Sequence, residues 1–359
     1  MRRALDLAAL GRGLAAPNPM VGAVLVRDGV VVGEGWHAGP GTHHAEVAAL
    51  EAAGEAARGA TLICTLEPCD HHGRTPPCTD ALIRAGIARA VIAATDPNPV
   101  VDGRGIARLR HAGIAVETGT LEAEARRLNR GFERHVVTGL PFVTLKLAAS
   151  LDGKTAAADG TSKWITGQEA RADVHRLRAG ADAILVGAGT VLADDPALTV
   201  RDPAFGGRPP LRVIADARGR VPADRTVFDD AAPSLVVTTD LAPPDRIAAW
   251  SDRGAEVVVV EASPAGVLVT RLVETLGKRD VQSLLVESGA TLAWSLVEAR
   301  LVDSIVLYLA PLLVGGATAP GVVGGAGFAP IGGAAPVDVV DVTALGRDLR
   351  VEADVHRDR

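Results

Sequence analysis

The chain has 359 residues, of which 48% are hydrophobic, and its 37 Lys and Arg against 43 Asp and Glu give a formal charge of −6. This length predicts about two domains, each large enough to bury a core. No apolar run approaches the ~20 residues of a membrane-spanning helix, and the first residues lack the apolar region of a signal peptide. The mildly acidic balance, without a basic run, argues against binding to nucleic acid or to an anionic membrane. We therefore expect a cytoplasmic protein whose partners are small molecules.

Strands and helices alternate through the first half of the chain, which predicts an α/β sandwich. Glycine and proline in Gly139-Leu140-Pro141 then interrupt the pattern, so we place the domain boundary after residue 141. In chain order, the hydrophobic periodicity predicts a strand over 21–26, a helix over 45–59, a strand over 61–66, a helix over 78–87, a strand over 88–95, a helix over 104–113, a strand over 114–119 and a polar helix over 121–139.

The second half, residues 142–359, repeats the alternation and predicts a second α/β domain. Glycine and alanine dominate residues 314–335, a stretch that fits either loops on a rigid sheet or a partly mobile tail. In chain order we expect a strand from Phe142, a helix over 168–180, strands over 182–190, 211–216, 234–240 and 256–260, a helix over 267–277, a strand over 283–287, a helix over 291–300 and a strand over 304–311.

Cysteine and histidine form the strongest motif in the first half. His44-Ala45-Glu46 opens a predicted helix, and Cys69 and Cys78 follow at the end of a buried strand and the start of the next helix. One imidazole and two thiolates suit tetrahedral Zn²⁺ and leave a fourth position for water, as catalytic zinc sites do. Glu46, two residues beyond the histidine, would be a base beside that water. The order H-x-E followed by Pro-Cys is the signature of the zinc nucleobase deaminases, although the cysteines here are more widely spaced.

Two other interpretations of this motif remain open at this point. His71 or His72 could complete a structural zinc site with four protein ligands, and His44 could also be a core residue unrelated to the cysteines. Cys64 lies inside the apolar stretch TLICTL, and we interpret it as a buried hydrophobic residue rather than a ligand.

The motifs of the second half are weaker. Gly189 and Thr190 follow a strand and would let the backbone approach a phosphate, but tight packing explains such glycines equally well. Ser288-Gly289-Ala290 lies between a strand and a helix, where backbone amides form an anion site. Neither of these glycine-containing stretches matches the G-x-G-x-x-G dinucleotide fingerprint. Asp194, followed by Asp-Pro, is equally typical of a turn or a helix cap.

Several stretches together resemble the bacterial bifunctional riboflavin-biosynthesis deaminase/reductase family. That resemblance covers most of the chain and weakens after Pro311. It implies a cytidine-deaminase-like α/β/α sandwich followed by a dihydrofolate-reductase-like α/β domain. The stretches that carry it are PNPMVG at 17–22, HAE at 44–46, EPCDHHGRTPPC at 67–78, DPNP at 96–99, LNRGF at 128–132, KLAASLDGKTA at 146–156, WIT at 164–166, TVLADDPALTVR at 190–201 and VESGATLA at 286–293.

For the first half, the resemblance implies that His44, Cys69 and Cys78 bind zinc and that Glu46 transfers the proton. The substrate would be a diaminopyrimidinone ribosylamine phosphate, attacked at its amine-bearing C2 with loss of ammonia. His43 stands where the family commonly has proline, and it is either a harmless surface residue or an imidazole that competes for the metal. The positions that match the family's substrate contacts are Asn18, His37, His71 and Arg74.

For the second half, the resemblance implies NADPH as hydride donor to C1′ of the ribosylamine, with Asp194 and Lys146 as acid/base candidates. Arg178 and Arg201 would pair with the 5′-phosphate. The family also implies a homo-oligomer, formed through the reductase half. Positions that match the family's NADP contacts are Ala148, Trp164, Thr190, Asp194, Ala217, Gly289, Ala290, Thr291, Leu292, Ala293, Trp294 and Ser295, and those that match substrate contacts are Ser162, Arg178, Leu198, Arg201 and Glu287.

Two alternatives to a bifunctional riboflavin enzyme fit parts of the sequence. The first is a deaminase of tRNA or free bases with an accessory nucleotide-binding domain, which the acidic net charge and the wide insert between Cys69 and Cys78 count against. The second is a non-catalytic protein in which zinc is structural and the second domain senses NADP.

Overall fold

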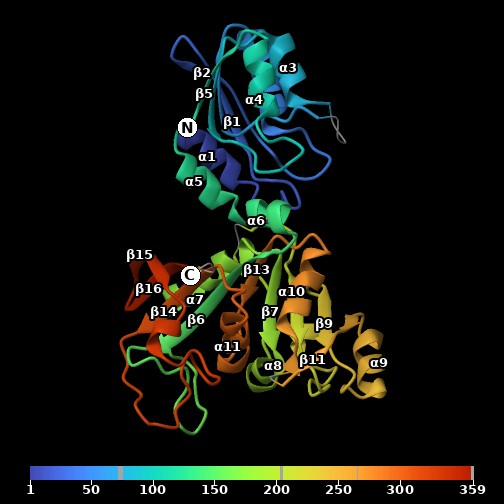
Figure 1. Ribbon diagram of the computed structural model, residues 1–359, viewed down its shortest axis with the longest axis vertical. Helices are drawn as coiled ribbons and strands as arrows, with labels where there is room; N and C mark the ends of the chain where they lie inside the picture. The colour runs from blue at the N-terminus through green and yellow to red at the C-terminus, as the bar shows by residue number, and fades with distance from the viewer. Residues whose placement is uncertain (72–75, 203–204, 265, 357–359) are drawn as a thin grey trace. The chain divides into compact units, whose positions relative to one another are not determined.

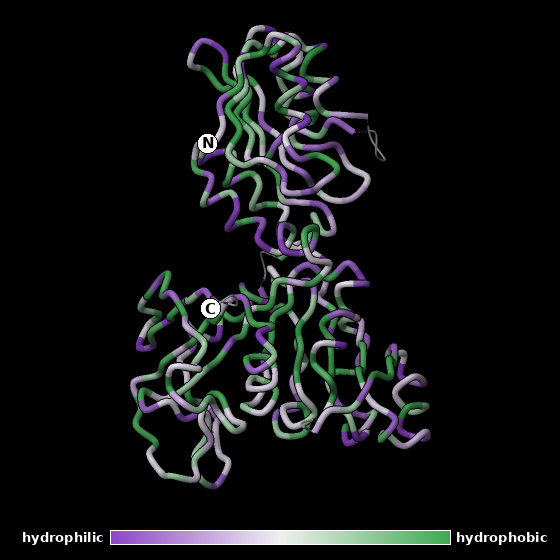
Figure 2. Tube along the Cα trace, in the orientation of Figure 1, coloured by the Kyte–Doolittle hydropathy of each residue, from purple (hydrophilic) through white to green (hydrophobic). Residues whose placement is uncertain are grey.

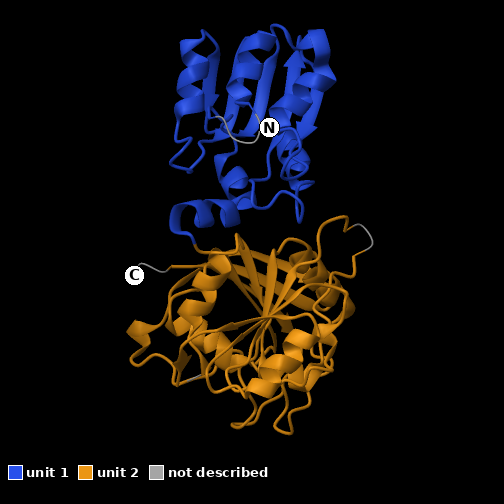
Figure 3. Cartoon of the chain, turned by 90° about the vertical axis from the view of Figure 1, so that its right-hand side faces the viewer, with its two compact units in different colours: residues 1–139 blue, residues 140–359 orange. Residues whose placement is uncertain are grey.

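The protein, analysed as a computed structural model, is described over residues 1–71, 76–202, 205–264 and 266–356. It divides into two compact units, Met1–Gly139 and Leu140–Arg359, shown in blue and orange in Figure 3. The expected boundary after residue 141 lies two residues beyond this division.

Unit 1 contains a five-stranded sheet in the order β2-β1-β3-β4-β5. Strand β1 runs antiparallel to both β2 and β3, whereas β3, β4 and β5 are parallel. The carboxyl ends of the parallel strands therefore share one edge of the sheet, where ligand sites of such sheets usually lie. The bounds are β1 Gly22–Arg27, β2 Val30–Trp36, β3 Thr61–Leu66, β4 Arg89–Ala94 and β5 Ala115–Thr118.

Helices cover both faces of this sheet, as Figure 1 shows, so unit 1 is an α/β/α sandwich. Helices α2, α3 and α4 enclose one core with the sheet, around Leu25, Leu62 and Ile92. Helix α1 packs its Ala4 and Leu7 against the opposite face. The bounds are α1 Arg2–Ala9, α2 Ala45–Ala53, α3 Cys78–Ala85, α4 Arg104–His111, α5 Glu122–Leu128 and α6 Arg130–Thr138.

Two helices of unit 1 are shorter than the sequence predicts. Helix α2 ends at Ala53 because Gly54 adopts a φ of 52°, and a 3-10 turn, Gly54–Ala57, follows. The polar helix expected over 121–139 is divided into α5 and α6 at Asn129. The Asn129 amide accepts a hydrogen bond from Met20 N and donates one to Met20 O, both at 2.8 Å. This residue of the LNRGF motif thereby fixes the PNPMVG motif 109 residues earlier.

Glycines in β2 allow helix α2 to pack very close to the sheet. A Cβ atom at Gly35 would lie 2.3 Å from the carbonyl oxygen of Ala45, and one at Gly33 would lie 2.3 Å from that of Ala49. Ala45 and Ala49 are themselves fully buried. Because α2 begins directly after His44, this contact also sets the position of that imidazole.

Unit 2 is built on a nine-stranded sheet in the order β10-β9-β8-β7-β13-β6-β14-β16-β15. The strands from β10 to β14 run parallel, and the last two are antiparallel. The bounds are β6 Phe142–Ser150, β7 Ala183–Gly187, β8 Leu211–Ala215, β9 Ser234–Thr238, β10 Glu256–Val259, β13 Ser283–Val286, β14 Ser304–Ala310, β15 Val337–Leu345 and β16 Asp348–Val355, beside a small separate pair, β11 Ala262–Ser263 and β12 Gly266–Val267.

The central strands of unit 2 are buried on both faces, which explains their continuous apolar sequences and the hydrophobic colour along them in Figure 2. In β7, Leu185 faces the core shared with α10 and α11, whereas Ile184 and Val186 face the opposite core, where Trp250 of α9 is fully buried. The bounds are α7 Gln168–Ala179, α8 Ala188–Asp194, α9 Pro244–Asp252, α10 Val269–Gly277 and α11 Ala290–Glu298.

Two features of unit 2 differ from the sequence expectation, namely the end of the strand expected over 182–190 and the hairpin after residue 335. The strand expected over 182–190 ends at Gly187, and Gly189 and Thr190 lie in the first turn of α8. Residues 314–335 contain a single 3-10 turn, Ile331–Gly333, but β15 and β16 then form a hairpin that extends the sheet. Among the described residues, no helix combines the length and hydropathy needed to cross a membrane.

We predict that Gly35→Ala destabilises unit 1 by about 1–3 kcal/mol, because the added methyl group forces α2 away from β2. Zinc content should fall with it, since α2 carries His44 at its start. Thermal unfolding and metal analysis of the purified variant check this. Gly206→Ala is the control, since a Cβ there meets no atom within 4 Å; equal stability of the two variants would contradict the close-packing argument.

Candidate functional site

Three soft donor atoms converge at the carboxyl edge of the unit 1 sheet. His44 is the N-cap of α2, Cys78 is the first residue of α3, and Cys69 lies in the loop after β3. His44 Nδ1 is 3.0 Å from Cys78 Sγ and 3.6 Å from Cys69 Sγ, and the two sulfur atoms are 3.4 Å apart. All three donor atoms fall within 4.8 Å of one another. This donor set and spacing fit a tetrahedral Zn²⁺.

The surroundings favour a thiolate at Cys69. Hydrogen bonds with the Cys78 thiol and with His44 lower the pKa of Cys69 to about 4, against the opposing effect of burial. Glu46 is 3% exposed beside these groups. Burial, together with the charge of Cys69, raises the pKa of Glu46 to about 7. A carboxyl group with such a pKa can both hold and release a proton near neutral pH.

The Glu67 carboxylate, which precedes Pro68-Cys69, is a residue whose role the sequence reasoning missed. It is 4% exposed, and its Oε2 accepts hydrogen bonds from Asp96 N at 3.2 Å and Gly103 N at 3.0 Å. Its Oε1 accepts one from Ile106 N at 3.0 Å. Gly103 is the N-cap of α4, so Glu67 satisfies the free amides at that end of the helix.

Helix α4 in turn supports the loop that carries Cys69. A Cβ atom at Gly105 would lie 1.9 Å from the carbonyl oxygen of Pro68, so the helix backbone touches the loop directly. Asp70 accepts a hydrogen bond from Thr79 Oγ1 at 2.6 Å and lies 3.2 Å from Arg108 Nε. These contacts join both sides of the cysteine loop to the same helix.

Two of the expected substrate contacts of unit 1, Asn18 and His37, are hydrogen-bonded to each other. His37 Nδ1 lies 3.2 Å from the His43 carbonyl oxygen, which requires a proton on Nδ1, so Nε2 accepts from Asn18 Nδ2 at 3.0 Å. The His37 and His44 rings meet edge to face, with centroids 5.4 Å apart. Asn18 and His37 therefore lie beside the metal ligands.

Of the other expected substrate contacts of unit 1, the structure describes His71 but not Arg74. His71 is exposed, and Arg74 lies outside the described residues, as does His72. The His43 ring pairs with Glu51 on the surface of α2, at 3.1 Å between Nδ1 and Oε1. That contact supports the interpretation of His43 as a surface residue rather than a competing ligand. Cys64 is fully buried in the core, as expected.

Unit 2 contains a cleft of about 1180 Å³ at the carboxyl ends of β7, β8 and β13. Although the whole chain carries a charge of −6, cations outnumber anions in the lining of this cleft. A cationic cleft in an acidic chain indicates a phosphate-bearing ligand. The lining cations are Lys146, Lys163, Arg171, Arg178, Arg201, Arg218 and Arg220, and the lining carboxylates are Asp194, Asp195 and Glu287.

The strongest ion pair of the cleft joins Arg178 of α7 to Glu287, directly after β13. Arg178 Nε and Nη2 donate to the two Glu287 carboxylate oxygens at 2.6 and 3.0 Å. Arg178 Nη1 donates to Thr199 O at 3.1 Å, and Lys146 Nζ lies 3.8 Å from Glu287 Oε2. Burial works to raise the pKa of Glu287, but Arg178 and Lys146 outweigh it and hold the pKa below its ordinary value. Arg178 thus binds a carboxylate, and the expected pairing of its guanidinium with a phosphate stays a prediction.

Arg201 is exposed in the cleft lining, as are Arg218 and Arg220, and His175 fixes the backbone of Arg201. Arg201 N donates to His175 Nδ1 at 3.2 Å. Burial, followed by the charges of Arg178 and Arg201, lowers the pKa of His175 and favours the neutral ring that this bond requires. His175 lines the cleft but was not among the expected site residues, because a lone histidine within a helix carries no motif.

Most expected cofactor positions line the cleft, with two exceptions in α11. Ala293 is fully buried in the core beneath the sheet, and Trp294 packs edge to face on Phe328, 4.9 Å between ring centroids. Helical periodicity turns these two side chains away from the cleft. The expected residues that do line it are Lys146, Ala148, Ser162, Trp164, Arg178, Thr190, Asp194, Leu198, Arg201, Ala217, Glu287, Gly289, Ala290, Thr291, Leu292 and Ser295.

Comparison with known proteins places both units in one family. A RibD C-terminal domain model matches residues 141–351, and a model of the cytidine and deoxycytidylate deaminase zinc-binding region matches residues 1–94. The riboflavin biosynthesis protein RibD of Escherichia coli is 44% identical over 326 residues, which is 88% of each chain. That of Bacillus amyloliquefaciens is 42% identical and covers 100% of this chain and 99% of its own. The chain belongs to the RibD family.

Solved RibD structures agree with this assignment along the whole chain. One form of Acinetobacter baumannii RibD aligns with a TM-score of 0.88 at 40% identity and covers 99% of this chain and 97% of its own. A diaminohydroxyphosphoribosylaminopyrimidine deaminase/5-amino-6-(5-phosphoribosylamino)uracil reductase from Thermotoga maritima aligns with a TM-score of 0.87 at 38% identity, with the same coverage. The expected fold class and the zinc centre of the deaminase half are confirmed. As a RibD protein, the chain is a deaminase and reductase of riboflavin biosynthesis.

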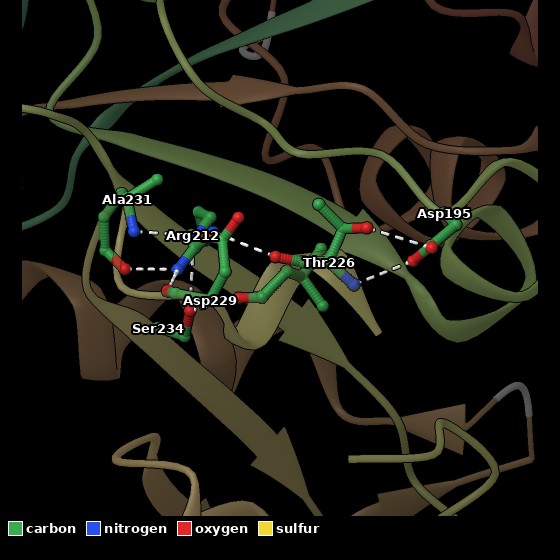
Figure 4. A network of polar contacts seen from close by, with 8 residues as sticks. Asp195, Arg212, Thr226, Asp229, Ala231 and Ser234 are labelled. Carbon is green, nitrogen blue, oxygen red and sulfur yellow. Dashed lines mark hydrogen bonds and ion pairs between the residues drawn. The ribbon is translucent and has the colours of Figure 1, made fainter. Parts of the chain in front are cut away.

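Behind the reductase cleft of this RibD chain, a fully buried cation organises the loop that supports α8. Figure 4 shows Arg212 of β8 with its partners: Nε donates to Ser234 Oγ at 3.0 Å and Nη1 to Asp229 Oδ1 at 2.6 Å. The same loop presents Thr226, whose N and Oγ1 both donate to the Asp195 carboxylate at 2.9 Å. Asp195 is the C-cap of α8, so the network fixes the end of the helix where Asp194 enters the cleft.

We predict that Glu67→Gln lowers stability by about 1.5–3 kcal/mol, the range for hydrogen bonds to a charged group. The amide NH₂ would face backbone N–H groups that the carboxylate now satisfies, and the Cys69 loop would lose its support. Zinc titration and thermal unfolding of the variant check this. Glu51→Gln, a matched change on the exposed face of α2, should leave both quantities unchanged; a similar loss in the two variants would contradict the role of Glu67.

Proposed function

We propose that residues 1–139 deaminate a diaminopyrimidinone ribosylamine phosphate at C2 and that residues 140–359 then reduce its ribosyl group to a ribityl chain with NADPH. The single observation that carries this proposal is the pairing, in one RibD chain, of a His-Cys-Cys centre beside a buried carboxylate with a separate cationic cleft. The first arrangement suits hydrolytic removal of an amine. The second suits two phosphate-bearing ligands.

In the deaminase half, we assign the metal to His44, Cys69 and Cys78. Zinc bound there would supply a Lewis acid that activates water at neutral pH. Glu46 is the acid/base group, because it lies in the first turn of α2, two residues after His44, and is only 3% exposed. It would take the proton of the attacking water and deliver a proton to the departing ammonia. Asn18 and His37, hydrogen-bonded to each other, are assigned to the pyrimidine ring.

In the reductase half, we assign the pyrimidine ribosylamine to the side of the cleft that holds Glu287, Arg201 and Ser162. NADPH would supply the hydride at C1′. The Glu287 carboxylate, fixed by Arg178 and Lys146, can accept hydrogen bonds from the substrate without moving. Arg201 is assigned to the 5′-phosphate. Lys146 and Asp194 remain the acid/base candidates for the oxygen released when the ribose ring opens.

The cofactor is assigned to the other side of the cleft, at the start of α8 and α11. Thr190 and Gly289 lie in or beside the first turns of these helices, where free backbone amides favour a phosphate. Asp194 pairs with Lys163 at 3.5 Å, and both residues line the cleft together with Trp164. Ala148, Ala217, Ala290, Thr291, Leu292 and Ser295 complete this assignment, and Ala293 and Trp294 are withdrawn from direct contact.

The same proposal covers assembly and surroundings. The protein is proposed to work in the cytoplasm on small molecules, without nucleic acid or membrane, in keeping with its charge of −6. It is proposed to form a homo-oligomer through unit 2. Support comes from β15, an edge strand in which Val337, Val339, Val340 and Val342 are between 43% and 60% exposed. Apolar edge strands of this kind pair readily with another chain.

We predict that Glu46→Gln retains zinc and loses deamination by about 100-fold or more, because Gln cannot transfer a proton. The measurement is NADPH oxidation with the diaminopyrimidinone ribosylamine phosphate as the only substrate, with zinc determined on the same sample. Oxidation should stop in the variant and return when the deaminated aminouracil is supplied. No oxidation by zinc-replete wild-type protein with either compound would refute the proposed substrate, and unchanged oxidation in the variant would refute the role of Glu46.

We predict that Val342→Lys weakens self-association, because it places a charge on the exposed edge strand of unit 2. Light scattering after size-exclusion chromatography gives the mass in solution. Val31→Lys is the matched control, since Val31 is 51% exposed on the edge strand β2 of unit 1. A wild-type protein that is monomeric at micromolar concentration, or a variant that associates as well as the control, would contradict assembly through β15.

A further inference from the structure

The turn of the C-terminal hairpin contacts the start of helix α7 through hydrogen bonds and close packing. The turn residues Gly346 and Arg347 join β15 to β16, and Leu345 at the end of β15 packs against the cluster that holds Ala170 and Val174 of α7. Asp348, the first residue of β16, is fully buried, and its Oδ2 accepts a hydrogen bond from Gly167 N at 2.6 Å. Gly167 is the N-cap of α7, a helix of 12 residues. A carboxylate at this position satisfies a free amide and faces the positive end of the helix dipole.

Two neighbours of Asp348 in the turn also contact the start of α7. Arg347 Nη2 donates to Ile165 O at 3.0 Å, two residues before the helix N-cap. Gly346 has a φ of 58°, and a Cβ atom there would lie 2.7 Å from the carboxyl group of Glu169 in the first turn of α7. The whole turn is therefore fitted against the first turn of the helix and the segment that leads into it.

A second contact holds the middle of the same helix. Arg350 Nε lies 3.0 Å from Asp173 Oδ2, and Tyr308 OH donates to the same oxygen at 2.7 Å. Tyr308 of β14 is 1% exposed and pairs in register with Arg350 of β16. Helix α7 is thus attached to the hairpin at its N-terminus and about one and a half turns later.

The residues held in this way form one wall of the reductase cleft. Arg171, His175 and Arg178 project from α7 into the cleft, and residues 162–166 line it just before the helix. The Trp164 ring lies 4.7 Å from the Arg171 guanidinium, so the leading segment and the helix form one surface. The hairpin itself lines no part of the cleft. It can influence ligand binding through α7 and the leading segment.

We propose that Asp348 is a positioning residue for NADPH binding, acting through Gly167 on the segment that carries Trp164. This rests on the proposed reductase function. The hairpin does not need this carboxylate to stay in place, because six residues of β16 pair with β14 along the sheet. Its buried charge is directed at α7 instead. Among the described residues, Lys146, Asp194 and Glu287 make no hydrogen bond or ion pair to residues 346–348. The turn therefore does not contact these groups of the reductase site directly.

The test compares Asp348→Ala, which removes the acceptor, with Asp348→Asn, which keeps an oxygen that can cap the helix. Asp338→Ala is the matched control, because Asp338 lies on the same hairpin and pairs with His356 on the surface. We expect the KM for NADPH to rise roughly three- to tenfold in Asp348→Ala, with kcat nearly retained. Asp348→Asn should recover most of the loss, and Asp338→Ala should match the wild type. Deamination in the same samples reports on unit 1 and should not change.

A second variant and a ligand-free measurement protect the test from misfolding and from an incorrect cofactor. Arg347→Ala removes an exposed side chain and should raise the KM for NADPH by a smaller factor. Amide hydrogen exchange of residues 162–167 should accelerate in Asp348→Ala and Arg347→Ala but not in Asp338→Ala. Wild-type exchange and wild-type KM in both variants would overturn the proposal. So would a parallel fall of deamination, reduction and melting temperature, because that pattern describes general destabilisation. If wild-type protein fails to oxidise NADPH, the proposed function is refuted. The exchange rates would still show whether Asp348 and Arg347 hold residues 162–167 in place.

Discussion

Burial of a carboxylate at the end of a parallel strand is the constraint on which both sites depend. Glu67 follows β3, Asp216 follows β8 and Glu287 follows β13, each directly after the last residue of its strand. Removing a charge from water costs several kcal/mol unless partners satisfy it. Glu67 uses backbone amides, Asp216 accepts from Val221 N at 2.7 Å, and Glu287 uses Arg178 and Lys146. Each carboxylate thereby fixes the loop or helix that carries the site residues.

The two units use this device for different ends. In the deaminase half, Glu67 accepts its hydrogen bonds from backbone amides, and its effect is to hold the Cys69 loop against α4. In the reductase half, the carboxylate faces the cleft itself, so the ions that satisfy it are also the ions that a substrate would meet. Pre-paired charges of this kind need no reorganisation when a ligand binds. Glu287, Arg178 and Lys146 therefore keep one charged part of the reductase site fixed before a ligand binds.

The sequence was sufficient for elements and motifs that depend on local pattern. The strand over 61–66 follows from hydrophobic periodicity, and the convergence of His44, Cys69 and Cys78 follows from their motifs and spacing. It was insufficient where a partner lies far along the chain. Arg178 and Glu287 are 109 residues apart, and nothing local shows that one neutralises the other. The hairpin of β15 and β16 was missed because its outer strand lacks a buried face, so the usual alternation signal is weak there.

In the segment Gly289 to Ser295, residues of one continuous family motif lie on different faces of helix α11. The motif is continuous in sequence, but only residues about three or four apart, with some of their neighbours, share a face of a helix. Ala293 and Trp294 lie on the face that packs against the core and Phe328, while Thr291, Leu292 and Ser295 face the cleft. The two core residues are still constrained, because their packing holds α11 at the depth where Gly289 and Ala290 reach the cleft. A residue can therefore belong to a binding motif by positioning a helix rather than by touching the ligand.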